Sequence, residues 1–464
     1  MKPAKANSYR RQRQQARKRS QRQAKHPRAP QRGRGQELVY QVYQTIHHCF
    51  PTLFEQMREL EDCRQKSNYS LAEILTAGVA MFVLKSGSRN AFNNRREEAR
   101  FRKNYQRLFK LRLPHLDTVH QVMTRLESDQ LERLKQRLLQ TLLHKKTLHR
   151  FRLLGRYFIV AVDASGVMRF AEQHCAQCLH KTSTKGKTTY FHNVLEAKLI
   201  APNGLALSLA TEWIENPEGD YDKQDCEMKA FVRLAAKLKA LYPRLPICLT
   251  ADGLYPNQTF FDACQRYDWR FIVTFKDGNL SSVWDEVNAL LPRCPAHHHH
   301  ERLLQGQHRL ARHYRWLSDI DYHGHRLHWL ECQETIDQDE PKRFVHLTDL
   351  RPTRATIATL SASGRLRWKI ENEGFNCQKH HGYGLQHQYA RNSYRAAQNY
   401  YQCLQIAHLI NQLVILSQHF QQRLTGKITI KHLWENLRGF LSFAHVCLQT
   451  LRALDQQRIQ IRLA

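Results

Sequence analysis

The sequence contains no uninterrupted run of about 18 apolar residues, the length that a helix needs to span a membrane. Its most apolar long segment, Cys403–Phe420, is broken by Gln405, His408 and Asn411, among other polar residues. We therefore expect no membrane-spanning segment. Acidic residues are absent from residues 1–36, which hold 13 Lys or Arg, and no apolar core follows this basic stretch. A secretory signal is therefore not expected either.

The twelve cysteines are scattered along the chain and lack the regular spacing of a disulfide framework. We therefore expect mostly free thiols in a reducing compartment. The chain also lacks a recognisable aromatic signature of RNA-binding domains, which weakens an RNA-binding interpretation.

Positive charge is what the sequence has in excess. Lys and Arg number 72 against 41 Asp and Glu, which gives a formal net charge of +31. Residues 37–464 alone keep 59 basic against 41 acidic residues, so the excess is not confined to the first segment. With 42% apolar and 10% aromatic residues, a chain of 464 residues can form two or three domains. We therefore expect a folded protein that binds a polyanion.

Composition and periodicity divide the chain into four segments. Residues 1–36 have the composition of a disordered basic arm that becomes ordered on a polyanion, although a solubility or targeting tail has the same composition. Residues 37–152 are predicted to form a helical DNA-binding domain, unless their basic stripe is only a solvated face. A mixed α/β domain is predicted for residues 153–424 and a helical C-terminal tail for residues 425–464.

Capping signals place two helices of the helical domain. Ser70 and Glu73 have capping-box spacing before the apolar run Ile74–Leu84. Asp117 is expected to cap a later helix.

Short apolar runs and helical stripes alternate after residue 153. The expected strands are Tyr157–Val162, Phe191–Ile200, Leu205–Thr211, Ile247–Ala251 and Arg270–Phe275, with helices at Gln224–Leu241 and from Asn257. This order is typical of a mixed α/β sheet of the ribonuclease H type. Short runs between about residues 277 and 362 predict a β-rich insertion, and helices are expected again at Trp368–Lys379 and Tyr394–Phe420.

Two aspartates follow short strands in equivalent places, Asp163 after Tyr157–Val162 and Asp252 after Ile247–Ala251. Strand ends of an α/β sheet hold side chains at the edge where ligands bind, and paired carboxylates there suit hard divalent cations. Either Asp alone would mean less, because Asp also caps helices and starts turns. Glu371, on a predicted helix that faces the sheet, supplies a third carboxylate.

The most specific pattern lies in residues 367–379 and consists of Arg367, Trp368, Ile370, Glu371 and Phe375. This segment resembles the DDE transposases of bacterial insertion sequences, in the cut-and-paste branch whose signature places Tyr, Arg, Glu and Lys around the third acidic residue. The resemblance covers about residues 40–420. It extends to Cys175-x-x-Cys178, Lys223–Glu227 and Gly382–Leu385. It implies an RNase H-like catalytic domain with a β-strand insertion and the catalytic triad Asp163, Asp252 and Glu371.

The sequence departs from this signature at two positions. The signature Tyr falls at Gly364, and the Lys falls one place late, at Lys379, with Gln378 in its expected place. Glu373, only two residues after Glu371, is an alternative third acid.

The resemblance also implies the chemistry and the partners. Asp163, Asp252 and Glu371 would hold two Mg²⁺ or Mn²⁺ ions for phosphodiester cleavage, in which water first frees a 3′-hydroxyl that then attacks target DNA. Arg367, Lys379 and Lys276 are candidates for DNA binding through phosphates. The expected partners are double-stranded DNA of terminal inverted repeats and target sites, with a homodimer in the DNA complex, in the bacterial cytoplasm at the nucleoid. The alternative is a catalytically inactive, transposase-derived DNA-binding regulator.

Several polar clusters allow two interpretations each. Cys175 and Cys178, with His174, His180 and His192, are either zinc ligands or ordinary core and surface groups. Asp225 and Glu227 either begin a helix or assist the metal site. Trp316 and Trp329 of the insertion either pack in the core or stack on an unpaired base. His297–His300 are expected in a polar loop, as a spacer or a site for stray metal.

Overall fold

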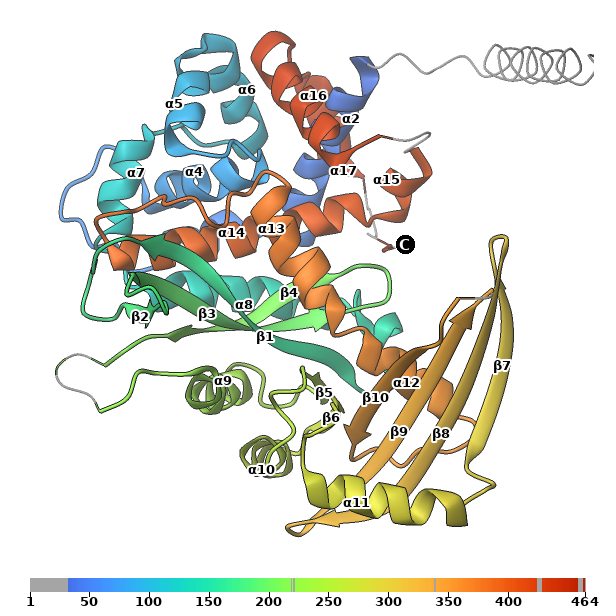
Figure 1. The fold of residues 1–464 in the computed structure, drawn as a ribbon. Helices are drawn as coiled ribbons and strands as arrows, with labels where there is room; N and C mark the ends of the chain where they lie inside the picture. Colours follow the sequence, from blue (N-terminus) through green and yellow to red (C-terminus); the bar gives the residue numbers. More distant parts are fainter. Residues whose placement is uncertain are drawn as a thin grey trace, which may run out of the picture.

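A computed structural model describes residues 32–217, 219, 222–337, 339–423, 428–457 and 462–463. It is a mixed α/β protein in which a helical layer lies over an open sheet (Figure 1). Most of the basic arm expected at residues 1–36 lies outside the described residues. Helix α2 (Arg32–Gln44) begins inside that segment, so the expected arm and the first described helix overlap over residues 32–36.

The described chain is helical from Arg32 to Phe151, as expected for this segment. After α2 its helices are η1 (Thr45–Cys49), α3 (Leu53–Arg58), α4 (Leu71–Val83), α5 (Arg89–Glu97), α6 (Ala99–Phe109), α7 (Leu116–Met123), α8 (Ser128–His144) and η2 (His149–Phe151). The predicted capping box of α4 is confirmed, because the Glu73 amide donates to the Ser70 hydroxyl and the Ser70 amide donates to the Glu73 carboxylate. The cap predicted at Asp117 is wrong, because α7 begins directly after His115, whose ring accepts the hydrogen bond from the Asp117 amide.

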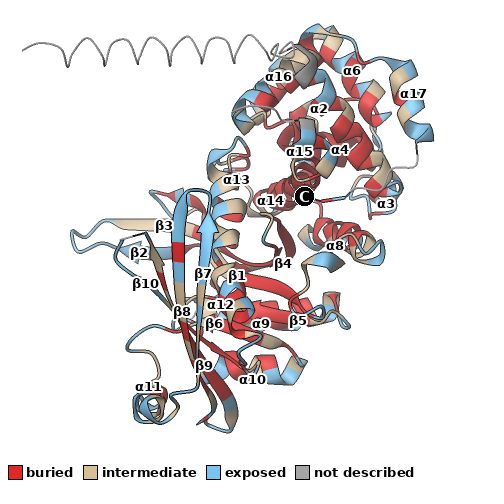
Figure 2. Ribbon diagram, turned by 90° about the vertical axis from the view of Figure 1, so that its right-hand side faces the viewer, coloured by how far each residue is buried: buried red, intermediate tan, exposed pale blue. Residues whose placement is uncertain are grey.

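Helices from distant parts of the sequence complete this layer. α14 (Tyr394–Ile415) packs against α4, α7 and α8, and both α4 and α14 are almost wholly buried (Figure 2). α16 (Ile430–Phe443) packs against α2 and α6. At Gly35 the two backbones approach so closely that a Cβ atom would lie 2.4 Å from the Asn436 carbonyl oxygen. α15 (Gln418–Arg423) contacts the preceding α14, and α17 (Leu448–Gln456) contacts α2. The described helices of the predicted C-terminal tail, residues 425–464, therefore belong to the helical layer.

Ten strands form one sheet within the described residues. They are β1 (Phe158–Phe170), β2 (Leu179–Thr182), β3 (Thr188–Ile200), β4 (Ala206–Ile214), β5 (Ile247–Thr250), β6 (Arg270–Thr274), β7 (His298–Gln305), β8 (His308–Tyr322), β9 (His325–Ile336) and β10 (Lys342–Thr348). The order is β2-β3-β1-β5-β6-β10-β9-β8-β7, and β4 pairs with β3. β1 is antiparallel to β3 and parallel to β5, and β5 is parallel to β6. β10 to β7 then continue the sheet as antiparallel strands.

Helices cover both faces of the half of the sheet that contains β1. α8 and α14 lie on one face, and α9 (Glu227–Leu241) and α10 (Gln258–Tyr267) lie on the other (Figure 1). The other half, β7 to β10, carries α11 (Ser281–Leu290), η3 (Leu291–Arg293) and α12 (Ile357–Arg365). η4 (Ile370–Asn376) and α13 (Cys377–His380) then lead back to the helical layer. The segment expected to be β-rich is therefore a four-stranded extension of the sheet.

Two sequence-based boundaries need correction. The strand predicted to stop at Val162 continues to Phe170, because hydrogen bonds to β3 hold the polar residues after Val162 in the ladder. His297–His300 were expected in a loop, but His298 begins β7 and the His300 ring stacks on His313 of β8 at 4.1 Å. In both cases pairing with a neighbouring strand overrides the polar character of the local sequence.

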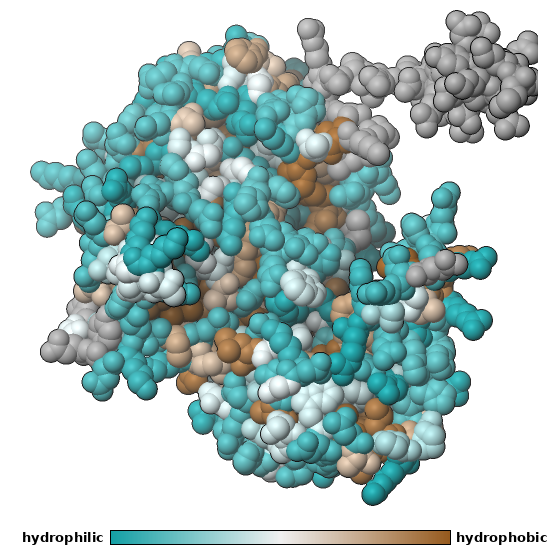
Figure 3. All heavy atoms as spheres, viewed as in Figure 1, coloured by the Kyte–Doolittle hydropathy of each residue, from teal (hydrophilic) through white to brown (hydrophobic). Residues whose placement is uncertain are grey.

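The surface seen in Figure 3 is largely hydrophilic, and its apolar residues form small separate patches. No helix in the described part of the chain combines the length and the apolar character that crossing a membrane requires. α14, the longest apolar candidate, carries Gln and Asn side chains that bond inside the protein.

The contact of α12 with β10 generates a stability prediction. A Cβ atom at Gly364 would lie 2.6 Å from the buried His346 ring and 2.8 Å from Ile272, so Gly364→Ala should destabilise the protein by about 1–3 kcal/mol through overpacking. Gly439, in the middle of α16, has open space at its Cβ position. Gly439→Ala should therefore be neutral or stabilising by up to about 1 kcal/mol, because Ala favours the helix. Urea denaturation of both variants tests the prediction, and equal stabilities would contradict it.

Candidate active site

The two aspartates lie side by side at one edge of the parallel pair β1 and β5. The last paired residues of these strands are Ala161 and Thr250, and Asp163 and Asp252 each lie two positions further along the chain. The carboxyl ends of parallel strands meet at the same edge, so the register brings the two carboxylates together. The Asp163 side chain is 20% exposed and that of Asp252 is 36% exposed, so both are open to a ligand.

Glu371 reaches this edge from η4, a π-helical segment that follows α12. Arg367, one turn earlier, donates a hydrogen bond from Nη1 to Glu371 Oε1 at 2.8 Å. The same Nη1 lies 3.8 Å from Asp163 Oδ2, and the Arg367 side chain is 7% exposed. One nearly buried guanidinium therefore joins the first and third predicted carboxylates.

The carboxylates perturb one another. Burial raises the pKa of Asp163 from 3.8 to about 7, the negative charge of Glu371 acts in the same direction, and Arg367 opposes the shift. Glu227, at the start of α9, is a fourth carboxylate whose charge also raises the pKa of Asp163. Burial and the charge of Asp252 raise the pKa of Glu227 itself. Such a concentration of partly buried negative charge is common at functional sites.

The predicted basic residues also gather here. Burial lowers the pKa of Lys379, while the charges of Asp163 and Glu371 oppose the shift, so its ammonium group lies within electrostatic reach of both. Lys276, after β6, has its Nζ atom 3.9 Å from Asp252 Oδ2 and is 62% exposed. With Arg367, all three residues singled out for phosphate binding therefore flank the carboxylates.

Two alternative residues near Glu371, Gln378 and Glu373, do not face the aspartates. Gln378, in the expected place of the signature Lys, is fully buried and bonds to α14. Glu373 accepts a hydrogen bond from Lys369 at 2.6 Å, and its side chain lies against the turn at Gly204. The structure therefore brings Glu371, and not Glu373, to the two aspartates.

A groove of about 700 Å³ opens beside the carboxylates. Asp252, Lys276, Arg367 and Glu371 line it, with further residues from β10 and α12 that include Arg343, His346 and Arg365. Sequence reasoning missed these residues of β10, because only the pairing of β10 with β6 brings them here and no local pattern signals that pairing. Trp368 also lines the groove and is 53% exposed.

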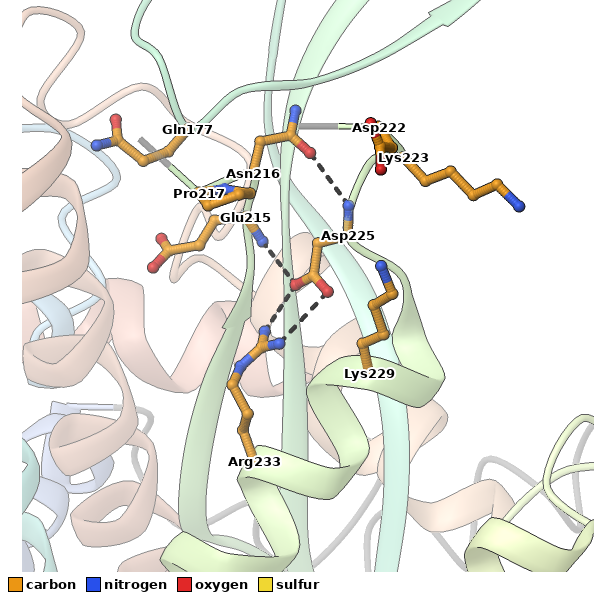
Figure 4. A pocket seen from close by; sticks show the side chains of 9 residues that line it. All are labelled: Gln177, Glu215, Asn216, Pro217, Asp222, Lys223, Asp225, Lys229 and Arg233. Carbon is orange, nitrogen blue, oxygen red and sulfur yellow. Dashed lines mark hydrogen bonds and ion pairs between the residues drawn. The ribbon is translucent and has the colours of Figure 1, made fainter. Parts of the chain in front are cut away.

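Asp225 does not belong to the carboxylate site. Figure 4 shows it in a separate pocket, where Arg233 Nη2 lies 2.6 Å from its Oδ2 atom and the Glu215 amide donates to the same oxygen. Asn216 accepts a hydrogen bond from the Asp225 amide. Of the two acids in the Lys223–Glu227 motif, only Glu227 therefore approaches the candidate active site.

A second group of predicted residues forms what we call the Cys-His cluster: His174, Cys175, Cys178 and His192. Their potential ligand atoms all lie within 4.8 Å of one another. His180, also considered as a ligand, is exposed and is not part of this group.

Trp316 and Trp329 are buried in the four-stranded extension. Trp329 is 1% exposed and Trp316 is 5% exposed and stacks on His297 at 5.6 Å. Core packing, one of the two interpretations considered for these residues, is what their burial supports.

A scan against models of protein families found no match to the chain, and a search of curated proteins found no relative.

The raised pKa of Asp163 predicts how stability depends on pH without divalent cations. Between about pH 4 and pH 7 the folded protein keeps a proton that the unfolded chain has released, so stability falls as pH rises through this window. An Asn side chain at position 163 cannot ionise, so the Asp163→Asn variant does not lose stability in this way. At pH 8 in chelator, Asp163→Asn should be more stable than the wild type, by on the order of 3 kcal/mol.

Thermal denaturation at several pH values measures the difference. At pH 4 both proteins carry a neutral side chain at position 163 and should melt at nearly the same temperature. A constant difference at all pH values would contradict the assignment of the titrating group.

Proposed function

We propose that the chain is a DDE transposase that binds the terminal repeats of a mobile element, cuts DNA by metal-dependent hydrolysis and joins the 3′-hydroxyl ends to target DNA. The observation that carries this proposal is the convergence of Asp163, Asp252 and Glu371 at one sheet edge. The negative charges of Asp163 and Glu371 oppose one another at this edge, so packing alone does not account for their proximity.

The topology supports the RNase H-like part of the proposal. β4, β3 and β1 are antiparallel neighbours, and β5 and β6 follow β1 in parallel after one helix each. This is the mixed sheet expected from the order of elements. The extension β7 to β10 lies between the second and third carboxylates in the sequence, where the resemblance implies an insertion.

The departures from the family signature have physical counterparts. In an α-helix, residues seven positions apart lie on the same face. The turns of η4 are π-helical and therefore wider, so the residue that lies on the same face as Glu371 comes later than seven positions after it. Lys379, eight residues after Glu371, is thereby brought to the site while Gln378 is buried. The His346 ring of β10 occupies the space that a side chain at position 364 would need.

The residues fit a pair of hard divalent cations. Asp163, Asp252 and Glu371 would hold Mg²⁺ or Mn²⁺, and Glu227 lies close enough to add to the negative field. When bound, two such ions stabilise the charges that develop on the attacking and leaving oxygens of a phosphodiester. Their positive charge would also relieve the repulsion that raises the pKa of Asp163.

The basic residues at the site would bind the phosphates of the DNA. Arg367 is held at the carboxylates, where a guanidinium can orient a phosphate. Lys379 lies within electrostatic reach of Asp163 and Glu371, and Lys276 lies beside Asp252. The net charge of +31 supports double-stranded DNA as the partner. A homodimer would hold the two ends of one element together, in the bacterial cytoplasm at the nucleoid.

The carboxylates are tested by isosteric amide variants. Asp163→Asn, Asp252→Asn and Glu371→Gln should each lower Mg²⁺-dependent cleavage and strand transfer by about 10³-fold or more, because each removes a metal ligand. DNA binding should remain, since the basic surface is unchanged. The assay is cleavage of a duplex carrying the element end, with joining to a plasmid target.

Glu373→Gln is the matched control, because Glu373 lies two residues away on the same segment and bonds Lys369 instead. It should keep activity within a few-fold of the wild type. Activity of Glu371→Gln with loss in Glu373→Gln would reverse the assignment of the third acid. A wild-type protein that binds the element ends but never cuts them would favour the alternative, an inactive regulator.

The basic arm should supply nonspecific affinity for DNA. Residues 1–31 carry 11 Lys or Arg, and their contacts with phosphates would release bound counterions. Deleting residues 1–31, which leaves α2 complete, should weaken nonspecific binding and flatten the dependence of log Kd on log salt concentration. Fluorescence anisotropy over a salt series measures both, and an unchanged slope would contradict a DNA-binding role for the arm.

A further inference from the structure

We propose that the Cys-His cluster is a structural zinc site, with His174, Cys175, Cys178 and His192 as its four ligands. The first three come from the loop between β1 and β2, and His192 comes from β3. Two thiolates and two imidazoles are a ligand set typical of structural zinc, whereas Mg²⁺ prefers oxygen. The inference is independent of the proposed function, since metal content can be read without DNA or catalysis.

The distances agree with the edges of a zinc tetrahedron. Cys175 Sγ and Cys178 Sγ lie 3.5 Å apart, and His192 Nε2 lies 3.3 Å from each. With Zn–S bonds of about 2.3 Å and Zn–N bonds of about 2.0–2.1 Å, tetrahedral edges are roughly 3.8 Å for S···S and 3.6 Å for S···N. A disulfide would require about 2.05 Å between the sulfurs. The arrangement is therefore open enough for an ion and too wide for a disulfide.

The surroundings orient the fourth ligand. The Nε2 atom of His174 is in contact with the Arg391 carbonyl oxygen, while its Nδ1 atom is buried without a hydrogen-bond partner. Zinc-binding histidines commonly donate one ring N–H to a backbone carbonyl and ligate through the other nitrogen. Nδ1 is therefore the expected ligand atom of His174, and the ion accounts for its otherwise unpaired burial.

Hydrogen bonds also preform the loop that carries the two cysteines. The Cys178 amide donates to the Cys175 carbonyl at 3.3 Å, which closes the turn between the sulfurs. Asn216 donates from Nδ2 to the Cys178 carbonyl at 2.8 Å and from its amide to Gln177. Asn216, two residues after β4, thus holds the loop through both its side chain and its backbone amide.

The site would fasten the region before α14 to the sheet. His192 stacks on Tyr394, the first residue of α14, at 4.2 Å, and His174 contacts Arg391. Gln388 donates to the Arg169 carbonyl of β1 at 2.9 Å in the same region. An ion here would hold the loop after β1 against β3, and the contacts of His174 and His192 would extend that link to Arg391 and Tyr394.

The experiment measures metal in the full-length protein, purified without added chelator. Mass spectrometry for elements should find about one zinc per chain. Cys178→Ser and His192→Asn should lose most of it, because each removes a ligand. Cys226→Ser and His180→Asn are matched controls, an exposed thiol and an exposed imidazole from neighbouring segments, and should keep about one zinc.

A second measurement needs no variant. Replacing zinc by Co²⁺ in the wild-type protein should give the intense visible absorption of tetrahedral cobalt with thiolate ligands, and removing the metal should lower Tm. Wild-type protein that takes up neither zinc nor Co²⁺ would overturn the proposal. Equal loss of zinc in the ligand variants and their controls would also overturn it.

Thiol titration in denaturant under non-reducing conditions separates the remaining alternative. A zinc site predicts that all twelve cysteines react after the metal is removed. Two fewer reactive thiols in the wild type, together with eleven reactive thiols in Cys178→Ser, would mean that Cys175 and Cys178 form a disulfide instead, and the proposal would be wrong.

Discussion

The ion pair of Glu196 and Lys198, fully buried between the sheet and the helical layer, is the interaction on which the candidate site depends. Their charged atoms lie 3.2 Å apart, and Tyr401 of α14 donates to Glu196 at 2.8 Å. Lys135 of α8 extends the network through hydrogen bonds to β4. Removing one partner of such a pair typically costs about 3–5 kcal/mol, because the other charge stays buried and unpaired. Glu196 lies directly opposite Asp163 in the ladder, so the network fixes the strand that carries the first carboxylate.

The same network fixes the position of the third carboxylate, Glu371. Lys198 donates to Gln405 of α14 at 2.8 Å, and its ammonium group lies 5.4 Å from the centre of the Phe375 ring on η4. Gln405 in turn bonds Gln378 of α13, the helix that directly follows η4, and so anchors it to the helical layer. Contacts with Lys198 of β3 and with α14 therefore fix the rotation of η4 about its axis. That rotation decides which of two nearby glutamates, Glu371 or Glu373, faces the aspartates.

Local sequence was sufficient to predict most helices and strands and to single out the residues that meet at the candidate site. A short β-rich run before each Asp and the capping box at Ser70 are local signals, whereas the choice of Glu371 came from the resemblance of the residue 367–379 segment. The continuation of β1 beyond Asp163 and the start of β7 at His298 were not predictable, because partner strands distant in the sequence decide them. The π-helical form of η4 and the entry of β10 into the groove depend equally on long-range packing.

The packing of α16 on α2 has a consequence for how the protein is made. Helix α2 is translated well before α16, whose Asn436 lies 401 positions after Gly35 and covers the surface there. Contacts between such distant segments form late in folding, because closing a long loop costs entropy before the contact stabilises it. Helix α2 therefore stays incompletely buried while the sheet is translated and folds. A nascent or prematurely terminated chain would thus expose the apolar face of α2, which makes it a target for chaperones and proteases.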